Sequence, residues 1–199
     1  MKRIALTGGI GTGKSQVLQL FRRRGIPTLD ADQVSRAAVD MSQHSCELLR
    51  KRFGAKYFLP NGQVNRSALA NLVFDDQSAR IDLESIVHTM VRRLIDDWFK
   101  RCNNSAAHKF AIAEIPLLFE TKRVEAFDGV LVVSCPPDEQ ISRIMKRDNL
   151  SSEAARKRLA AQLPIAAKIA AASWVIRTDS TLADTARQVE QFSIGVQST

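Results

Sequence analysis

Cysteine and histidine are scarce in this chain, and long apolar runs are absent. Cys46, Cys102 and Cys135 lie far apart, and the three histidines are equally scattered. This spacing fits neither a disulfide framework nor a metal site built from these residue types. No apolar run approaches the length of a membrane span, and the apolar residues after position 3 are too few for a signal-peptide core. We therefore expect a cytoplasmic protein with no membrane partner.

The remaining composition is that of an ordinary globular protein. Of the 199 residues, 45% are hydrophobic and 25% are charged, which suits one domain (1–199) with a substantial core. The net charge of +8 invites a nucleic-acid hypothesis. However, seven basic and only two acidic residues lie between Arg143 and Lys168, so this stretch carries most of the excess. Such a local patch favours a polyanionic small molecule, and we expect no nucleic-acid partner.

Positions 8 to 15 read G-G-I-G-T-G-K-S, which fits the phosphate-binding pattern G-x-x-x-x-G-K-[ST] at every fixed position. An apolar run precedes the motif and a helical pattern follows it, a context that disfavours a glycine-rich turn with a chance lysine. Glycines let successive N–H groups point inward, Lys14 reaches the outer phosphates and the Ser15 hydroxyl suits Mg²⁺. The sequence therefore predicts ATP and Mg²⁺ as ligands. The residues expected to bind ATP here are Gly9, Ile10, Gly11, Thr12, Gly13, Lys14, Ser15 and Gln16, with Ser15 as the metal ligand.

Five short apolar runs alternate with helical patterns, which predicts an α/β fold with a five-stranded parallel sheet flanked by helices. The expected strands are Arg3–Thr7, Pro27–Asp30, Phe110–Ile115, Gly129–Ser134 and Trp174–Arg177. The expected helices between them are Ser15–Arg24, Glu139–Arg147 and Leu182–Phe192.

The interval from about 33 to 108 breaks this alternation and reads as a helical insertion on the substrate side of the domain. Within it, helical patterns cover Val34–Val39, Cys46–Phe53, Arg66–Val73 and a long stretch from Gln77 to about Arg101. Turn residues at Gly54 and Pro60–Gly62 separate them.

Two aspartates end the second predicted strand, in the run Asp30-Ala31-Asp32. Carboxylates there lie where open α/β sheets bind ligands, so either could accept a proton from an attacking hydroxyl or hold Mg²⁺ through water. Arg36 shares a helix face with Asp32 if a helix begins near that residue. The alternative is a helix N-cap, which aspartate forms well, and spacing alone does not choose between the two. The N-K-x-D run of a GTPase is absent from the sequence.

Two further groups of candidates follow the third and fourth predicted strands. Glu114 is a possible second carboxylate near Mg²⁺, and Pro116, Leu117 and Leu118 after it either wall a substrate pocket or belong to the core.

Arg143 and Arg147 are four residues apart on one helix face. Arginines there neutralise charge on a transferring phosphoryl group, although such a face is more often merely solvated. The basic segment from about 143 to 164 is expected to act as a lid.

Taken together, these motifs resemble bacterial dephospho-CoA kinases. The matching runs are positions 6–15, Asp30-Ala31-Asp32 with Arg36, Pro116 to Glu120, Arg143 with Arg147-Asp148, and Ala160-Ala161-Gln162, in the family's order over about residues 4 to 176. The resemblance implies a P-loop kinase core with a helical substrate-binding insertion and a lid. It also implies phosphorylation by ATP of the ribose 3′-hydroxyl of dephospho-CoA, with Asp32, Lys14 and Arg143 as catalytic residues. Arg147 would also bind ATP, and Asp32, Arg36, Pro116, Leu117 and Leu118 would bind the substrate.

Two other functions remain open at this point. Another nucleoside or nucleotide-type kinase would share the same fold, and a nucleic-acid-dependent ATPase would use the basic patch. The oligomeric state is expected to be a monomer or a small homo-oligomer.

Overall fold

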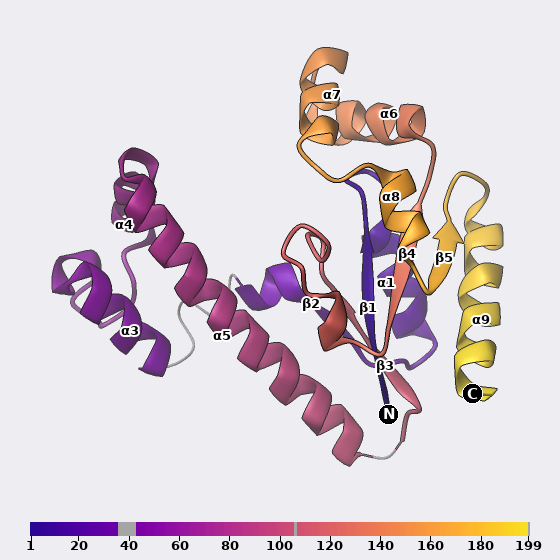
Figure 1. Cartoon of the computed structure of the whole chain (residues 1–199), viewed down its shortest axis with the longest axis horizontal. Helices are drawn as coiled ribbons and strands as arrows, with labels where there is room; N and C mark the ends of the chain where they lie inside the picture. The colour runs from indigo at the N-terminus through magenta and orange to yellow at the C-terminus, as the bar shows by residue number, and fades with distance from the viewer. Residues whose placement is uncertain (36–42, 106, 199) are drawn as a thin grey trace. The chain divides into compact units, whose positions relative to one another are not determined.

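The computed structural model describes residues 1–35, 43–105 and 107–198. Within these residues a five-stranded, entirely parallel sheet has the order β2-β3-β1-β4-β5 (Figure 1). The predicted sheet is confirmed, and every strand end lies within one residue of its expected position. The strands are β1 (Lys2–Gly8), β2 (Thr28–Asp30), β3 (Phe110–Glu114), β4 (Gly129–Ser134) and β5 (Trp174–Arg177).

The central strand β1 is apolar at consecutive positions because both of its faces are covered. Ile4, Ala5 and Leu6 are completely buried, with β3 on one side of the strand and β4 on the other. The chain therefore leaves β1 at the point where the strand order reverses, which is where open parallel sheets bind ligands. The fold thus carries the glycine-rich loop to this edge.

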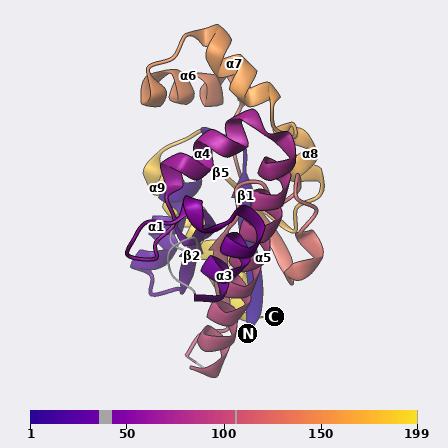
Figure 2. The same cartoon turned by 90° about the vertical axis from the view of Figure 1, so that its left-hand side faces the viewer.

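The chain forms two compact units, and the sheet lies in the first, Met1–Asp30 with Phe99–Thr199. Its helices α1 and α9 pack together, and their apolar side chains form one core with those of the sheet. Helices α6 and α7 form a neighbouring pair near the carboxyl ends of β1 and β4 (Figures 1 and 2). The helices of this unit are α1 (Lys14–Arg23), α6 (Pro137–Asp148), α7 (Ser152–Ala160), α8 (Ile165–Ala170) and α9 (Leu182–Ser198), besides the short η2 (Val124–Ala126).

An aromatic cluster closes the sheet on the side of α9. Phe192 makes edge-to-face contacts with Phe21, Phe110 and Trp174, at centroid distances of 5.5, 5.8 and 5.3 Å. Trp174 reaches across to Gly129 on the neighbouring strand, where a Cβ atom would collide with the indole ring. The absent side chain of Gly129 is what admits the tryptophan.

The second unit, Ala31–Trp98, is helical, as the insertion was expected to be. Residues 31–35 are helical, and the rest of the helix expected over Val34–Val39 lies outside the described residues. Leu49, Phe53, Val64, Leu69 and Ala79 form the core of this unit. Its further elements are α3 (Gln43–Phe53), η1 (Ala55–Tyr57), α4 (Arg66–Asp75) and the start of α5 (Gln77–Asn104), which continues into the first unit.

The two units differ in charge. Residues 31–98 contain nine basic and nine acidic residues, whereas the remainder of the chain contains 20 basic and 12 acidic residues. The whole net charge of +8 therefore belongs to the unit that carries the glycine-rich loop. Across the described residues, no helix combines the length and the apolar character needed to cross a membrane.

Helix α9 begins with a reciprocal cap, which gives a stability prediction. Thr181 Oγ1 accepts a hydrogen bond from Asp184 N (3.1 Å) and donates one to Asp184 Oδ2 (2.7 Å). Hydrogen bonds from Ser180 and Thr181 lower the pKa of Asp184 to about 2. We expect Thr181→Ala to destabilise the fold by about 1 kcal/mol, or roughly 2–4 °C in Tm for a chain of this size. Calorimetry measures this, with Thr181→Ser as the control that keeps the cap.

Candidate active site at the phosphate-binding loop

The loop between β1 and α1 has the backbone that its glycines permit. Gly11 and Gly13 adopt positive φ angles of 77° and 83°, a region that other residues rarely enter, and Gly13 caps α1. Thr12 is fully buried, and its Oγ1 donates to Gly9 O at 2.9 Å. A hydrogen bond within the loop therefore closes it, and the loop runs directly into the N-terminus of α1. Backbone N–H groups at a helix N-terminus favour the binding of an anion.

Lys14 lies folded over this loop. Its Nζ donates to Gly9 O at 2.9 Å and to Gly8 O at 3.4 Å, which holds the ammonium group above the loop. Ser15 and Gln16 follow in the first turn of α1 and are exposed. The residues named by the motif are thus contiguous on one surface where a phosphate chain would lie.

Two glutamines hold the peptide groups of Ile10. Gln162 Oε1 accepts from Ile10 N at 2.8 Å, and Gln140 Nε2 donates to Ile10 O at 2.6 Å. Gln140 is completely buried on α6. The Ile10 side chain also packs against the apolar cluster between α6 and α7. The loop is therefore supported from outside at its exposed turn.

Arg143 contacts the loop from α6. Its Nη1 donates to Gly11 O at 3.4 Å and to Thr178 Oγ1 at 3.1 Å, and its Nη2 donates to Thr178 O at 2.6 Å. Thr178 follows β5 and donates its own hydroxyl proton to Thr12 O at 2.7 Å. Nearby, burial raises the pKa of the Cys135 thiol, whose sulfur lies 3.8 Å from Gly11 O. Arg143 thus ties the loop to β5, a contact that was not expected from the sequence.

Arg147 lies one turn further along α6 and forms a two-pronged ion pair with Asp148 at 2.8 and 2.9 Å. Arg158 of α7 donates to the same carboxylate at 2.6 Å. The hydrogen bond from Arg147 first, and then the positive charges of Arg147 and Arg158, lower the pKa of Asp148. Arg147 is 60% exposed, so it keeps access to solvent at the proposed lid. Arg156 is exposed on α7.

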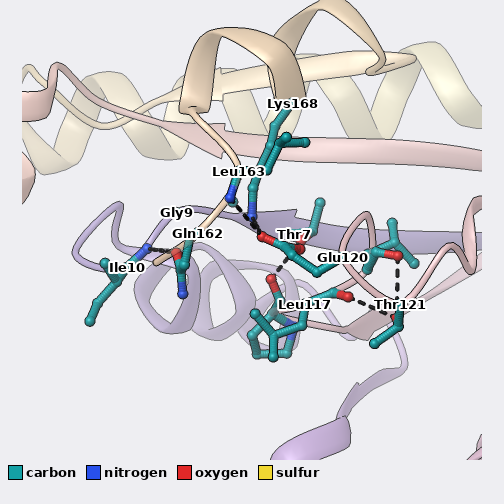
Figure 3. Close-up of polar contacts among 12 residues, drawn as sticks. Thr7, Gly9, Ile10, Leu117, Glu120, Thr121, Gln162, Leu163 and Lys168 are labelled. Atoms are coloured by element: carbon teal, nitrogen blue, oxygen red, sulfur yellow. Dashed lines mark hydrogen bonds and ion pairs between the residues drawn. The ribbon is translucent and has the colours of Figure 1, made fainter. Parts of the chain in front are cut away.

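The loop after β3 contains the three expected substrate residues in different environments. Leu118 is fully buried, which fits the core alternative for this residue. Leu117 is 46% exposed and Pro116 is partly buried, so both residues keep surface that a substrate could contact. Figure 3 shows this loop beside Thr7, whose Oγ1 donates to Pro116 O at 3.2 Å.

Carboxylates lie where the sequence placed them, at the ends of β2 and β3. Asp30 and Glu114 are register partners on adjacent parallel strands, so their side chains leave the sheet on the same face. Their oxygen atoms and the Ser15 hydroxyl are the hard donors that Mg²⁺ prefers, and phosphate oxygens complete such a site. Among the residues described, no group of three His, Cys, Asp or Glu side chains forms a metal site by itself. The donor set therefore fits a magnesium ion that arrives with a nucleotide.

Asp32 is exposed in the helical segment 31–35 of the second unit. Arg36, its expected partner on the helix face, lies outside the described residues. The roles of both stay predictions.

Comparison with known proteins places this arrangement in one family. A profile of the family described as dephospho-CoA kinase matches residues 2–184. The chain belongs to the dephospho-CoA kinase family. A dephospho-CoA kinase from Hydrogenovibrio crunogenus is 37% identical over 193 residues, which cover 96% of each chain. The resemblance found in the motifs is therefore confirmed over nearly the whole chain.

Solved structures agree with this family. The dephospho-CoA kinase from Campylobacter jejuni superposes with a TM-score of 0.68 at 25% identity, covering 98% of this chain and 97% of that chain. The protein TT1252 from Thermus thermophilus gives a TM-score of 0.76 at 34% identity over the same shares. The predicted P-loop kinase fold is confirmed.

Three residues that support the phosphate-binding loop were not predicted from the sequence: Gln140, Thr178 and Gln162. Gln140 carried a signal, because it is a polar residue on the apolar face of α6 that also contains Ile141 and Ile144. Thr178 follows the end of a parallel strand, where ligand-site residues gather. Gln162 was noted only as part of a family motif, since nothing local indicates its partner.

Replacing Gly11 tests the loop geometry. A Cβ atom at Gly11 would lie 2.8 Å from Gln140 O, and its φ of 77° is unfavourable for any side chain. We expect Gly11→Ala to raise the KM for ATP at least about tenfold, since both the strain and the clash deform the loop. Gly25→Ala is the matched control, because Gly25 has a φ of 74° with nothing within 4 Å of the new Cβ. It should lower stability and leave the KM unchanged, and equal KM values in both variants would contradict the prediction.

Proposed function

We propose that this chain transfers the terminal phosphoryl group of ATP to the ribose 3′-hydroxyl of dephospho-CoA, giving coenzyme A and ADP. The observation that carries the proposal is a complete phosphate-binding loop in a chain that matches dephospho-CoA kinases over residues 2–184. The excess positive charge of the loop-bearing unit suits two polyanionic substrates.

On this proposal the loop binds the phosphates of ATP. Among residues Gly9 to Gln16, the N–H groups that follow Ile10 would surround the phosphate oxygens, and Lys14 would exchange its carbonyl partners for the β- and γ-phosphates. Ser15 would hold Mg²⁺, and Asp30 and Glu114 are the carboxylates proposed to assist it. When bound, the ion neutralises the charge that develops between the β- and γ-phosphates.

Asp32 is proposed as the base that accepts the proton of the 3′-hydroxyl as the new P–O bond forms. The proton leaves the hydroxyl for the Asp32 carboxylate, and the bond between the γ-phosphorus and its bridging oxygen breaks to release ADP. Arg36, Pro116 and Leu117 would bind the acceptor, as would Leu118 if its loop rearranges. Arg143 and Arg147 would stabilise the charge on the transferring group.

The segment of about 143–164 is proposed as a lid that closes over ATP and excludes water, while about 33–108 would hold the acceptor. Hydrogen exchange tests the lid. Protection in this segment should rise when nucleotide and acceptor are both bound, and slow exchange that ligands leave unchanged would contradict it.

The direct test incubates the purified protein with ATP, Mg²⁺ and dephospho-CoA and identifies the product by mass spectrometry. We expect a product heavier by one phosphoryl group, and fragmentation should place that group on the ribose 3′ oxygen. A panel of nucleosides and nucleotides serves as the acceptor control, since a preferred alternative acceptor would assign another small-molecule kinase. ATP hydrolysis stimulated only by DNA or RNA would assign the third candidate function. The cytoplasmic location and the monomeric or small homo-oligomeric state stay predictions.

A further inference from the structure

The segment Gln162–Lys168, called here the bridge segment, joins two loops that are far apart in the sequence. At its first residue, Gln162 Oε1 accepts a hydrogen bond from Ile10 N in the phosphate-binding loop at 2.8 Å. At the next residue, Leu163 N donates to Glu120 Oε1 in the loop after β3 at 3.2 Å. Figure 3 shows both contacts leaving the same turn of the chain. The position of one loop is therefore linked to that of the other.

An ion pair fixes the bridge segment at its last residue, Lys168. Lys168 Nζ lies 2.7 Å from Glu120 Oε1, the same oxygen that accepts from Leu163 (Figure 3). The Lys168 side chain is completely buried, and that of Glu120 is 23% exposed. Although burial acts most strongly and opposes it, hydrogen bonds from Lys168 and Leu163 lower the pKa of Glu120. Glu120 is thus charged, and one of its oxygens is held at a single point.

The burial of Lys168 argues for a positional role. Removing an ammonium group from water is costly, and an apolar pair of similar volume would fill the same space without that cost. An apolar pair, however, would offer no carboxylate oxygen to accept the hydrogen bond from Leu163 N. The ion pair with Lys168 holds Glu120 Oε1 in the position where it accepts that bond. The ion pair therefore sets the place of the turn that begins with Gln162.

At its first residue, Gln162, the bridge segment acts on the part of the phosphate-binding loop that precedes the phosphate-binding N–H groups. Ile10 N and Ile10 O are both held by side chains, so the two peptide planes flanking Ile10 have fixed orientations. Gly11, Thr12 and Gly13 follow directly, and their N–H directions depend on those planes. Loss of the Gln162 contact would free the Ile10 N–H and widen the range of loop shapes.

We propose that Gln162, Glu120 and Lys168 are positioning residues that hold the phosphate-binding loop in its ATP-binding shape. Gln162 acts on the Ile10 peptide, and the Glu120–Lys168 pair acts through Gln162. The proposal rests on the proposed function for its kinetic consequence, because it assigns the loop to ATP. It places the effect in nucleotide binding and leaves proton transfer at Asp32 unaffected.

Gln162→Ala is the first test, with ADP binding measured by calorimetry beside steady-state kinetics. We expect the Kd for ADP and the KM for ATP to rise about threefold to tenfold, the factor that corresponds to one hydrogen bond, with kcat within twofold. Gln188→Ala is the matched control, since Gln188 Oε1 accepts from Arg177 N at 2.8 Å at the sheet edge. A merely structural contact would lower Tm in both variants and leave both constants unchanged, which would overturn the proposal.

Lys168→Met is the second test, and Arg24→Met, which breaks the surface pair of Arg24 with Glu190, is its control. We expect Lys168→Met to raise the Kd for ADP by no more than Gln162→Ala does, about threefold to tenfold, because it acts through that residue, and Lys168→Arg to restore part of the loss. Combined with Gln162→Ala, the increases should be less than multiplicative, because the residues act in series. If the increases in the Kd for ADP multiply fully in the double variant, the two residues act independently, and the proposal that Lys168 acts through Gln162 is wrong. If Lys168→Met fails to fold, Gln162→Ala alone decides.

ADP binding separates this proposal from the proposed function. It needs no acceptor, so a wild-type protein that makes no coenzyme A would refute the function and leave the binding comparison valid. Normal coenzyme A synthesis with an unchanged Kd in Gln162→Ala would refute only the positioning role.

Discussion

Replacement of Lys14 by alanine is expected to lower turnover by about a hundredfold or more while the fold stays intact. The Nζ atom donates to two backbone carbonyl oxygens, Gly9 O at 2.9 Å and Gly8 O at 3.4 Å. The alanine variant removes a fixed positive charge from the β- and γ-phosphates. Steady-state kinetics at saturating ATP and dephospho-CoA measures the effect, and calorimetry gives Tm.

Lys109→Ala is the control for this prediction, because Lys109 is an exposed lysine that directly precedes β3, outside the proposed ATP and acceptor sites. It should leave turnover unchanged. Turnover of Lys14→Ala near that of the wild type at saturating ATP would show that the loop does not bind phosphates through this lysine.

Asp32→Asn is expected to reduce phosphoryl transfer by about 10²- to 10⁴-fold and to leave ADP affinity unchanged. Asparagine has the shape of aspartate but does not accept a proton at neutral pH. Because asparagine caps helices as well as aspartate does, a capping role predicts no loss in this variant. Single-turnover kinetics measures the transfer step without product release.

Asp32→Ala completes the comparison. A cap would lose about 1 kcal/mol of stability in the alanine variant only, whereas a base loses transfer in both variants. Unchanged turnover in Asp32→Asn together with a lowered Tm in Asp32→Ala would make Asp32 a structural residue.

The sheet was predictable from the sequence because its determinants are local. Buried parallel strands appear as consecutive apolar residues, as at Ile4–Leu6, and β4 and β5 have the expected bounds. The phosphate-binding loop was predictable for the same reason, since its backbone shape depends on glycines within eight positions. The cap formed by Thr181 and Asp184 is equally local, although it was not predicted.

The supports of the loop were not predictable in the same way. Gln162 and Gln140 reach Ile10 across 152 and 130 positions of sequence. Arg143 shows the same difficulty, because its charge suggested a phosphate partner while its contacts with Gly11 O and Thr178 O depend on tertiary structure. A charge is visible in a sequence, but a backbone oxygen that accepts from it is not.

The contact between Gly129 and Trp174 has an evolutionary consequence. The indole ring occupies the volume that a side chain on β4 would fill, so the two positions share one fixed space although they are far apart in sequence. A relative with a small or acidic residue at the position of Trp174 is free to carry alanine or valine at that of Gly129, whereas a relative with tryptophan is not. Substitutions at these two sites should therefore covary, and neither is neutral without the other.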